Sequence, residues 1–192
     1  MTVAIIRRFD RVRLPHTGEE RRLLYVSAAT LMALSPGDSD EHAYTEIADV
    51  IRQRSADAMN DLEELWRRIA FSILINNVDD HLHNHGFLHV AGDLWRLSPA
   101  FDINPFPDRA RELKTWISEQ VGPQASIRAL VDSAQYFGLS QSQAAGVLGD
   151  VERAVATWPT VAATLGLTAE ETESYADAFE HSERTVAQRL MA

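Results

Sequence analysis

Cysteine is absent from this chain of 192 residues. Disulfide bonds and zinc sites built from thiolates are therefore excluded, and a cysteine-free sequence suits a reducing compartment, so we expect a cytoplasmic protein. The sequence also lacks the run of about 20 apolar residues that a membrane-spanning helix needs, and it shows no secretory leader pattern. We therefore expect no membrane partner.

Positive charge is also in short supply, because 18 Lys and Arg residues stand against 28 Asp and Glu residues, a net charge of -10. Proteins that coat nucleic acids need a basic excess, so we expect no direct nucleic-acid binding. The charge is uneven, since the first 24 residues hold six arginines and three acids. This basic end either forms a solvated hairpin with its own acids or faces an anionic ligand or partner.

With 45% hydrophobic and 24% charged residues, the composition is that of an ordinary globular protein, and the length suffices for one sizeable core. Apolar spacing and turn signals predict a mainly α-helical fold with a small β-hairpin component, which is an α+β class. We expect a single domain over residues 1–192 with four segments: edge strands in 1–26, helices in 27–77, a loop and hairpin in 78–106, and helices in 107–192.

The strongest helix signal covers residues 61–77. Asp61 and Glu64 have capping-box spacing, with Asp in place of the usual Ser or Thr, and apolar residues then recur every three or four positions. This stripe is predicted to be core. Further helices are expected over 28–34, 44–52, 126–137, 140–157 and 168–190, with caps at Ser140 and Thr168, and strands at 3–6 and 23–26.

Three polar residues have the types that phosphoryl transfer requires: the acid Asp79, the amide Asn84 and a second acid, Asp102. Two short apolar segments, 87–90 and 94–97, flank an Ala-Gly-Asp turn and predict a hairpin that leads toward Asp102. Asp79 would orient an attacking hydroxyl by accepting its proton. Asn84 and Asp102 would offer the oxygen ligands that magnesium prefers.

Simpler interpretations compete with this one. An Asp and an Asn five residues apart occur in many loops as turn or cap residues, and the neighbouring Asp80 complicates the choice of acid. Histidine is also concentrated here, which could indicate a zinc or iron site in a metal-dependent hydrolase; the residues are His81, His83, His85 and His89. Against this, the alternating histidines would share a face only on a strand, and we expect a loop in which His81 hydrogen-bonds backbone groups.

These residues resemble the HipA-like serine/threonine kinases, which are toxins of bacterial type II toxin-antitoxin systems. That family carries an Asp-x-His-x-x-Asn loop, and here the loop reads Asp79-Asp80-His81-Leu82-His83-Asn84. The resemblance extends to the Leu-Ser-Pro-Ala-Phe-Asp-Ile segment at 97–103 and to the Arg-Phe-Asp-Arg segment at 8–11.

The resemblance implies a kinase-like large lobe, in which a helical bundle carries a catalytic loop and a metal-binding hairpin. It implies that Asp79 is the catalytic acid, that His81, Asn84 and Asp102 belong to the cofactor site, and that Asn84 and Asp102 bind Mg²⁺. The implied activity transfers the γ-phosphate of ATP to a Ser or Thr hydroxyl of a protein substrate. An antitoxin is the implied partner.

The chain departs from the family at its start. The family's glycine-rich phosphate loop and ATP-contacting lysine precede the Arg-Phe-Asp-Arg segment, whereas this sequence begins at that boundary and its single lysine, Lys114, follows Asp102. Because phosphoryl transfer depends on positioning and charge neutralisation, we expect an isolated chain to be incomplete as an enzyme. The alternative is a catalytically silent remnant or interaction module that binds an antitoxin or a separately encoded small lobe.

Overall fold

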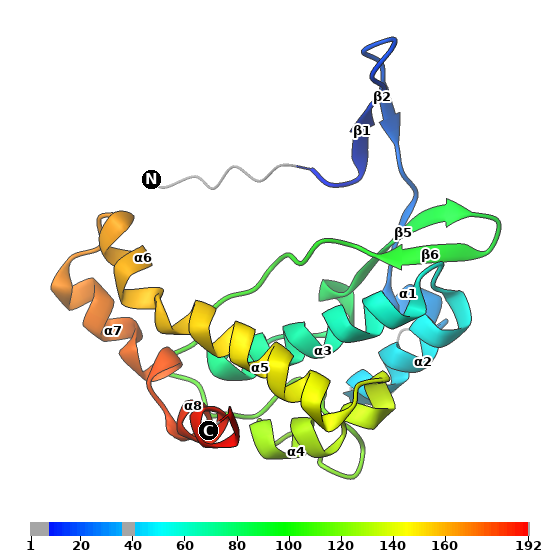
Figure 1. Cartoon of the computed structure of the whole chain (residues 1–192). Helices are drawn as coiled ribbons and strands as arrows, with labels where there is room; N and C mark the ends of the chain where they lie inside the picture. Colours follow the sequence, from blue (N-terminus) through cyan, green and yellow to red (C-terminus); the bar gives the residue numbers. More distant parts are fainter. Residues whose placement is uncertain (1–7, 36–40, 192) are drawn as a thin grey trace.

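Helix α3 (Ala58–Leu74) lies at the centre of the structure, and several other helices pack around it (Figure 1). The computed structural model describes residues 8–35 and 41–191. The predicted apolar stripe of α3 is buried, and each of its members is at most 3% exposed: Leu62, Leu65, Trp66, Ile69, Ile73 and Leu74. Burial of a side chain of this size stabilises the fold by about 1.5–3 kcal/mol. The stripe is therefore the main anchor of the core.

The start of α3 differs from the prediction. The helix begins at Ala58, so Asp61 lies inside the first turn and does not cap it. The buried Asp61 carboxylate accepts hydrogen bonds from Ser55 Oγ (2.6 Å), Arg96 Nε (3.0 Å) and the Leu97 amide (3.0 Å). The capping-box spacing was misleading because these contacts with distant residues use the carboxylate instead.

Four helices and one short turn cover α3: α2 (Tyr44–Arg54), α4 (Ile127–Asp132), η2 (Ala134–Phe137), α5 (Gln141–Ala156) and α8 (Ser182–Met191). Trp66 of α3 is fully buried, and its Nε1 donates to the Leu130 carbonyl oxygen at the end of α4 (3.2 Å). The largest core side chain therefore has its polar atom paired, as a buried indole requires.

The predicted caps at Ser140 and Thr168 are confirmed, because each side chain accepts a bond from the third helical amide of α5 and of α7 (Ala169–Phe179). The helix predicted over 168–190 is two helices, α7 and α8. Helix α1 (Ala28–Leu31) ends early because Ala33 takes a left-handed conformation, φ 57°. Helix α6 (Trp158–Thr164) follows α5. None of the helices in the described part of the chain is both long and apolar enough to cross a membrane.

Small sheets complete the α+β fold. β5 (Gly86–Ala91) pairs antiparallel with β6 (Leu94–Leu97), which confirms the predicted hairpin, and β3 (Tyr25–Ser27) pairs with the other edge of β5. β4 (His42–Ala43) and β7 (Thr115–Trp116) form a short parallel pair. The predicted fold class is therefore correct.

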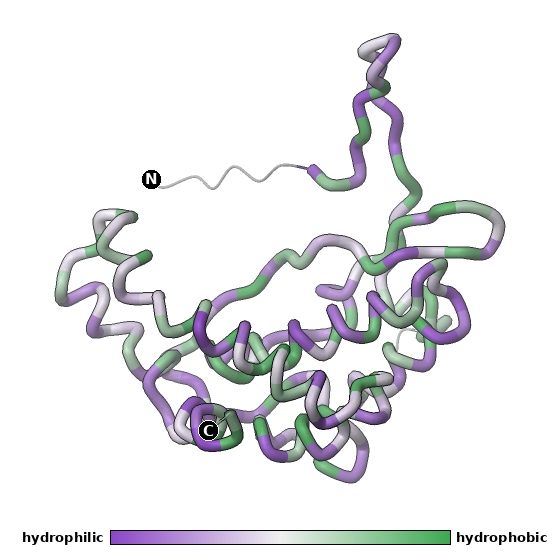
Figure 2. The backbone as a smooth tube through the Cα atoms, in the orientation of Figure 1, coloured by the Kyte–Doolittle hydropathy of each residue, from purple (hydrophilic) through white to green (hydrophobic). Residues whose placement is uncertain are grey.

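The N-terminal strands differ from the prediction. β1 (Arg11–Arg13) and β2 (Glu20–Arg22) form a polar hairpin that projects from the helices (Figures 1 and 2). The strand predicted over 3–6 lies outside the described residues, and the strand predicted over 23–26 begins only at Tyr25. The prediction followed the hydropathy of the sequence and placed the strands on apolar segments. In the structure, the two strands that pair, β1 and β2, are both charged.

Charges within this hairpin partly neutralise one another. The Arg11 guanidinium lies 3.5 Å from the Asp10 carboxylate and 3.4 Å from that of Glu20, and Arg8 binds Asp10 at 2.6 Å. Solvent screens exposed pairs of this kind, so they contribute little to stability. The arrangement supports the interpretation of the basic end as a solvated hairpin.

His181 connects the start of the C-terminal helix α8 to the end of α3, because its Nε2 lies 3.2 Å from the Leu74 carbonyl oxygen. Burial, together with the charge of Arg111, lowers the pKa of His181 from 6.5 to about 4. Between these two pH values the ring is neutral in the folded chain and protonated in the unfolded chain. Folding stability therefore falls as the pH drops through this window.

We expect the His181→Gln variant to lose this contribution to the pH dependence. Urea unfolding of the parent and the variant at several pH values between about 5 and about 7 measures the free energy of unfolding of each. The slope of that free energy against pH should be shallower in the variant by up to about one bound proton. Equal slopes in the two chains would show that His181 does not titrate differently on unfolding.

Candidate functional site

The loop that carries Asp79 begins at a capped helix end. Asn76 has φ 53°, the left-handed conformation that terminates many helices. The Asn77 amide donates to the Ser72 carbonyl oxygen (2.8 Å), and the Asn76 amide donates to that of Ile73 (3.3 Å). These two bonds close the last turn of α3, so the chain leaves the helix directly toward Asp79.

The loop from Asp79 to Asn84 is closed on itself. Its last three residues form the short helical turn η1 (Leu82–Asn84), and the Asn84 amide donates to the His81 carbonyl oxygen (2.8 Å). Asn84 Nδ2 donates to the Asp79 carbonyl oxygen (3.3 Å), which joins two of the predicted site residues. This bond uses the side-chain nitrogen of Asn84. The side-chain oxygen Oδ1, which is the atom that can bind a cation, takes no part in it.

The adjacent acids Asp79 and Asp80 occupy opposite environments. The Asp79 side chain is 53% exposed and lies 3.4 Å from Arg109 Nη1. Such a pair contributes roughly 0–1 kcal/mol, so a substrate hydroxyl can displace it. Asp80 is buried and accepts a bond from the Tyr44 hydroxyl (2.6 Å). The geometry therefore favours Asp79 for chemistry and Asp80 for support of the loop.

Asp80 is held at both its side chain and its backbone. Burial by itself raises the pKa of the Asp80 carboxyl, but the His85 ring (Nε2 at 3.1 Å), the Tyr44 hydroxyl and the charge of His81 outweigh burial and hold that pKa below its ordinary value. Burial and the Asp80 charge raise the pKa of the Tyr44 phenol well above its ordinary value. Thr115 Oγ1 donates to the Asp80 carbonyl oxygen (2.7 Å), which ties β7 to the loop.

Helix α3 also positions the strand that leads to Asp102. Arg68, which is 8% exposed, donates from Nη2 to the Ser98 carbonyl oxygen (2.6 Å). The Ser98 amide donates in turn to the Gly86 carbonyl oxygen (2.8 Å), two residues after Asn84. The chain therefore leaves the β5–β6 hairpin beside the end of the Asp79 loop.

Asp102 itself is exposed and has φ 55°, a conformation that Asp and Asn tolerate better than most residues. Its carboxylate accepts a bond from Asn104 Nδ2 (3.1 Å), and the Asn104 amide donates to Asn77 Oδ1 (3.4 Å). The Asp102 segment thus returns to the helix end from which the Asp79 loop starts. The structure brings the two predicted segments together through Asn104 and Asn77.

Two aromatic rings, those of Phe9 and Tyr25, pack around Phe101, the residue that precedes Asp102. The Phe101 ring centroid lies 5.7 Å from that of Phe9 and 6.4 Å from that of Tyr25. Phe9 belongs to the Arg-Phe-Asp-Arg segment, so this segment does reach the site. The Tyr25 ring packs directly against Gly86. A Cβ atom at Gly86 would lie only 2.3 Å from Tyr25 Cε2. Any larger residue would displace this cluster.

The histidines do not gather into a metal centre. Among the residues that the structure describes, no three His, Cys, Asp or Glu side chains are placed to hold a metal ion together. His85 turns inward to Asp80, and His89 Nε2 lies 2.8 Å from the Gly92 carbonyl oxygen. His81 Nδ1 is buried and has no hydrogen-bond partner within residues 8–35 and 41–191, so the backbone bond predicted for this ring is not seen there.

Sequence reasoning missed residues that hold the site together. Asn77 and Gly86 carried a signal, because an asparagine pair ends the predicted helix and a glycine follows the loop directly. Tyr44 carried none, since it lies 36 residues from the carboxylate it contacts. Arg109 likewise belongs to a stretch without regular structure, and hydropathy says nothing about its contact with Asp79.

The sequence model of the HipA-like C-terminal domain matches residues 1–158. This chain belongs to that family. The matched range includes the Asp79 loop, the β5–β6 hairpin and the Asp102 segment, which are the parts of the HipA-like chain that sequence analysis singled out.

Two relatives give the HipA-like chain its context. A protein of Haemophilus influenzae named "Putative kinase" is 29% identical over 75 residues, which cover 37% of this chain and 22% of that protein. A chain in the Shewanella oneidensis MR-1 complex of HipA, HipB and operator DNA matches with a TM-score of 0.56 and 17% identity, over 96% of this chain and 46% of that one. The HipA-like chain thus spans about a fifth of the first relative and less than half of the second, and the structural likeness shows a shared fold.

The contrast between the two aspartates yields a test by substitution. Asp80→Asn should lower the free energy of unfolding by about 1–3 kcal/mol, because hydrogen bonds and charge contacts of a buried carboxylate are weakened. Asp79→Asn should change it by less than about 0.5 kcal/mol, as exposed substitutions usually do. Chemical denaturation of both variants measures these values, and an equal loss in both would contradict the assignment of roles.

Proposed function

We propose that this chain is the large lobe of a HipA-type protein serine/threonine kinase. In this proposal, the oxygen of a Ser or Thr hydroxyl on a protein substrate bonds to the γ-phosphorus of ATP, the bond to the bridging oxygen breaks, and ADP leaves. The observation that carries the proposal is the exposed Asp79 carboxylate on a loop that Asn84 Nδ2 closes by donating to the Asp79 backbone carbonyl oxygen, beside the returning Asp102 segment.

Asp79 is the residue that accepts the proton of the attacking hydroxyl. Its carboxylate is exposed, and its pairing with Arg109 is weak enough to be exchanged for a hydrogen bond to the substrate. The backbone around it is fixed by Asn84 on one side and by the buried Asp80 on the other. A base on a rigid loop keeps the near-attack geometry that phosphoryl transfer depends on.

The residues present fit a magnesium site. Asn84 offers the neutral Oδ1 oxygen and Asp102 a carboxylate, and magnesium in nucleotide sites takes one or two protein oxygens and completes its shell with phosphates and water. The left-handed backbone at Asp102 is the kind of local strain that clusters at functional sites. When bound, the ion neutralises charge that develops on the phosphates.

His81 belongs to the same proposed cofactor site. Its Nδ1 is buried and lacks a partner in the described part of the chain, and its ring meets that of His83 edge-on at 5.8 Å. Buried polar atoms are usually satisfied, so an unpaired ring nitrogen beside the loop is suited to a hydrogen bond with a ligand or an ordered water.

A partner-binding role is the second candidate. The Shewanella oneidensis HipA was determined together with HipB and operator DNA, and this chain spans 46% of the chain it matches. In this alternative the chain binds an antitoxin or a separately encoded small lobe in the cytoplasm and does not turn over by itself. Both candidate functions use the same fold. They differ because the kinase function requires nucleotide binding and the partner-binding function does not.

Calorimetric titration of ATP with excess magnesium into the purified chain distinguishes the two candidates. We expect binding in the parent chain and a loss of affinity of at least about 10–100-fold in Asp102→Ala, because removing a direct metal ligand should cost no less than removing the outer-shell groups that support one. Asp79→Asn should retain nucleotide binding, because it removes the base and leaves Asn84 and Asp102 in place.

Asp93→Ala is the matched control, because Asp93 is an exposed acid in the turn of the β5–β6 hairpin. Its affinity for magnesium and ATP should equal that of the parent. An absence of heat in the parent would reject nucleotide binding by this chain and leave the partner-binding candidate.

A further inference from the structure

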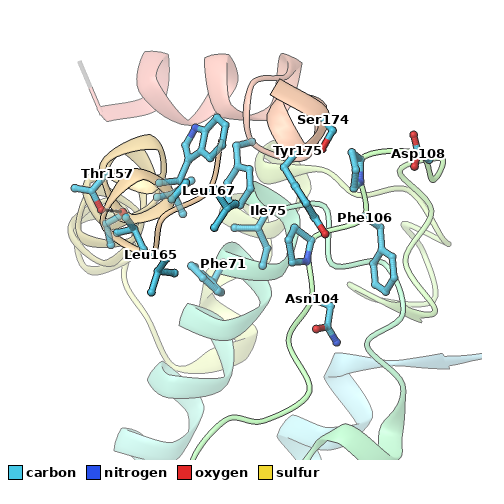
Figure 3. Close-up of a pocket in the computed structure, with 18 residues that line it drawn as sticks. Phe71, Ile75, Asn104, Phe106, Asp108, Thr157, Leu165, Leu167, Ser174 and Tyr175 are labelled. Atoms are coloured by element: carbon cyan, nitrogen blue, oxygen red, sulfur yellow. Dashed lines mark hydrogen bonds between the residues drawn. The ribbon is translucent and has the colours of Figure 1, made fainter. Parts of the chain in front are cut away.

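The end of α3, the loop after Asp102 and helices α5, α6 and α7 line an open pocket of about 1090 Å³ (Figure 3). Its inner wall is apolar and includes Phe71 and Ile75 of α3, Trp158 of α6 and Phe179 of α7. This volume lies just above the usual range of about 300–1,000 Å³ for ligand sites, and it exceeds what one small side chain fills. The pocket can therefore admit one or two large apolar groups.

The rim of the pocket carries large apolar side chains that face solvent. Leu165 is 73% exposed, Val161 50% and Tyr175 41%, and all three line the pocket. Single exposed apolar residues are ordinary, but several gathered at the mouth of one cavity mark a binding surface.

The charged residues near this rim are mostly acidic, and two arginines lie among them: Arg109 over the Phe106 ring and Arg111, which donates to the Asp177 carbonyl oxygen. Helix α7 carries four exposed acids and no basic residue: Glu170, Glu171, Glu173 and Asp177. Asp108 lines the opposite side of the pocket, and α6 has no charged residue. Acids on both sides of an apolar cavity attract a basic partner and repel phosphates. Nucleotide is therefore a poor occupant.

The wall of the pocket contacts Asp102 of the proposed active site directly and reaches Asp79 through Arg109. Asn104 lines the pocket and donates to Asp102, while Phe106 lines it and lies under the Arg109 guanidinium, 4.0 Å from its ring centroid. Arg109 in turn lies 3.4 Å from Asp79. An occupant that touches Asn104 and Phe106 is thus one side chain away from Asp102 and two side chains away from Asp79.

We propose that this pocket docks the protein substrate of the kinase, an inference that rests on the proposed function. One or two apolar side chains near the phospho-acceptor Ser or Thr enter the cavity, and Lys or Arg residues of the same segment lie along the acids of α7. The pocket then sets which hydroxyl reaches Asp79. The substrate segment is apolar and basic.

Short fluorescent peptides test the docking without nucleotide, so the result is independent of whether the chain binds ATP. Each peptide has a central Ser and Leu or Phe residues at varied spacing, and each is made in an Arg-containing and a Glu-containing form. Fluorescence anisotropy with the full chain measures the affinity. We expect binding of Arg-containing peptides and a loss of roughly tenfold or more in Leu165→Glu, because an apolar contact is replaced by a charge.

Leu94→Glu is the matched control, since Leu94 is 44% exposed on the distant β5–β6 hairpin. It should bind the peptides like the parent, and circular dichroism should show both variants folded. The inference is overturned if no peptide of the set binds, if the Glu-containing forms bind equally well, or if Leu165→Glu binds like Leu94→Glu. It is also overturned if sedimentation shows that the parent self-associates through this face and Leu165→Glu does not.

Discussion

The corner at Asn76 and Asn77 is the constraint on which the site depends. Its left-handed turn ends α3, and each asparagine side chain then contacts the segment after Asp102: Asn76 Nδ2 donates to the Phe106 (2.5 Å) and Arg109 (3.1 Å) carbonyl oxygens, and Asn77 Oδ1 accepts from the Asn104 amide. One helix end therefore orders two segments that lie far apart in sequence. The buried stripe of α3 fixes where this corner is, because moving it would open the core.

Burial separates two neighbouring carboxylates into different roles. An unpaired charge at the depth of Asp80 would be costly, so Tyr44, His85 and Thr115 surround this residue. Those contacts anchor the peptide that links it to Asp79, whose own carboxylate faces solvent. One carboxylate cannot be both buried to hold the loop rigid and exposed to solvent. The buried Asp80 therefore holds the loop, and the exposed Asp79 carboxylate stays accessible.

Much of the fold could be predicted from sequence where the signal was local. The spacing of apolar residues located α3, and the Ser140 and Thr168 caps marked the starts of α5 and α7, because each depends on residues within one or two turns. Asp61 misled because its partners, Arg96 and Leu97, come from a distant strand. Within the candidate site, residue types picked out the loop, but the choice between Asp79 and Asp80 depended on burial by residues that are remote in sequence.

The apolar pocket is connected to Asp79 by two weak contacts of Arg109. The small energy of these contacts limits how strongly an occupant of the pocket can affect Asp79. The stacking of Arg109 on Phe106 and its pairing with Asp79 are both solvent-exposed, and each is worth about 1 kcal/mol or less. Occupancy of the pocket can therefore change the state of Asp79 by a factor of about five at most. A contact of that size is too small for a switch. It suits a docking site whose effect on rate comes from placing the hydroxyl.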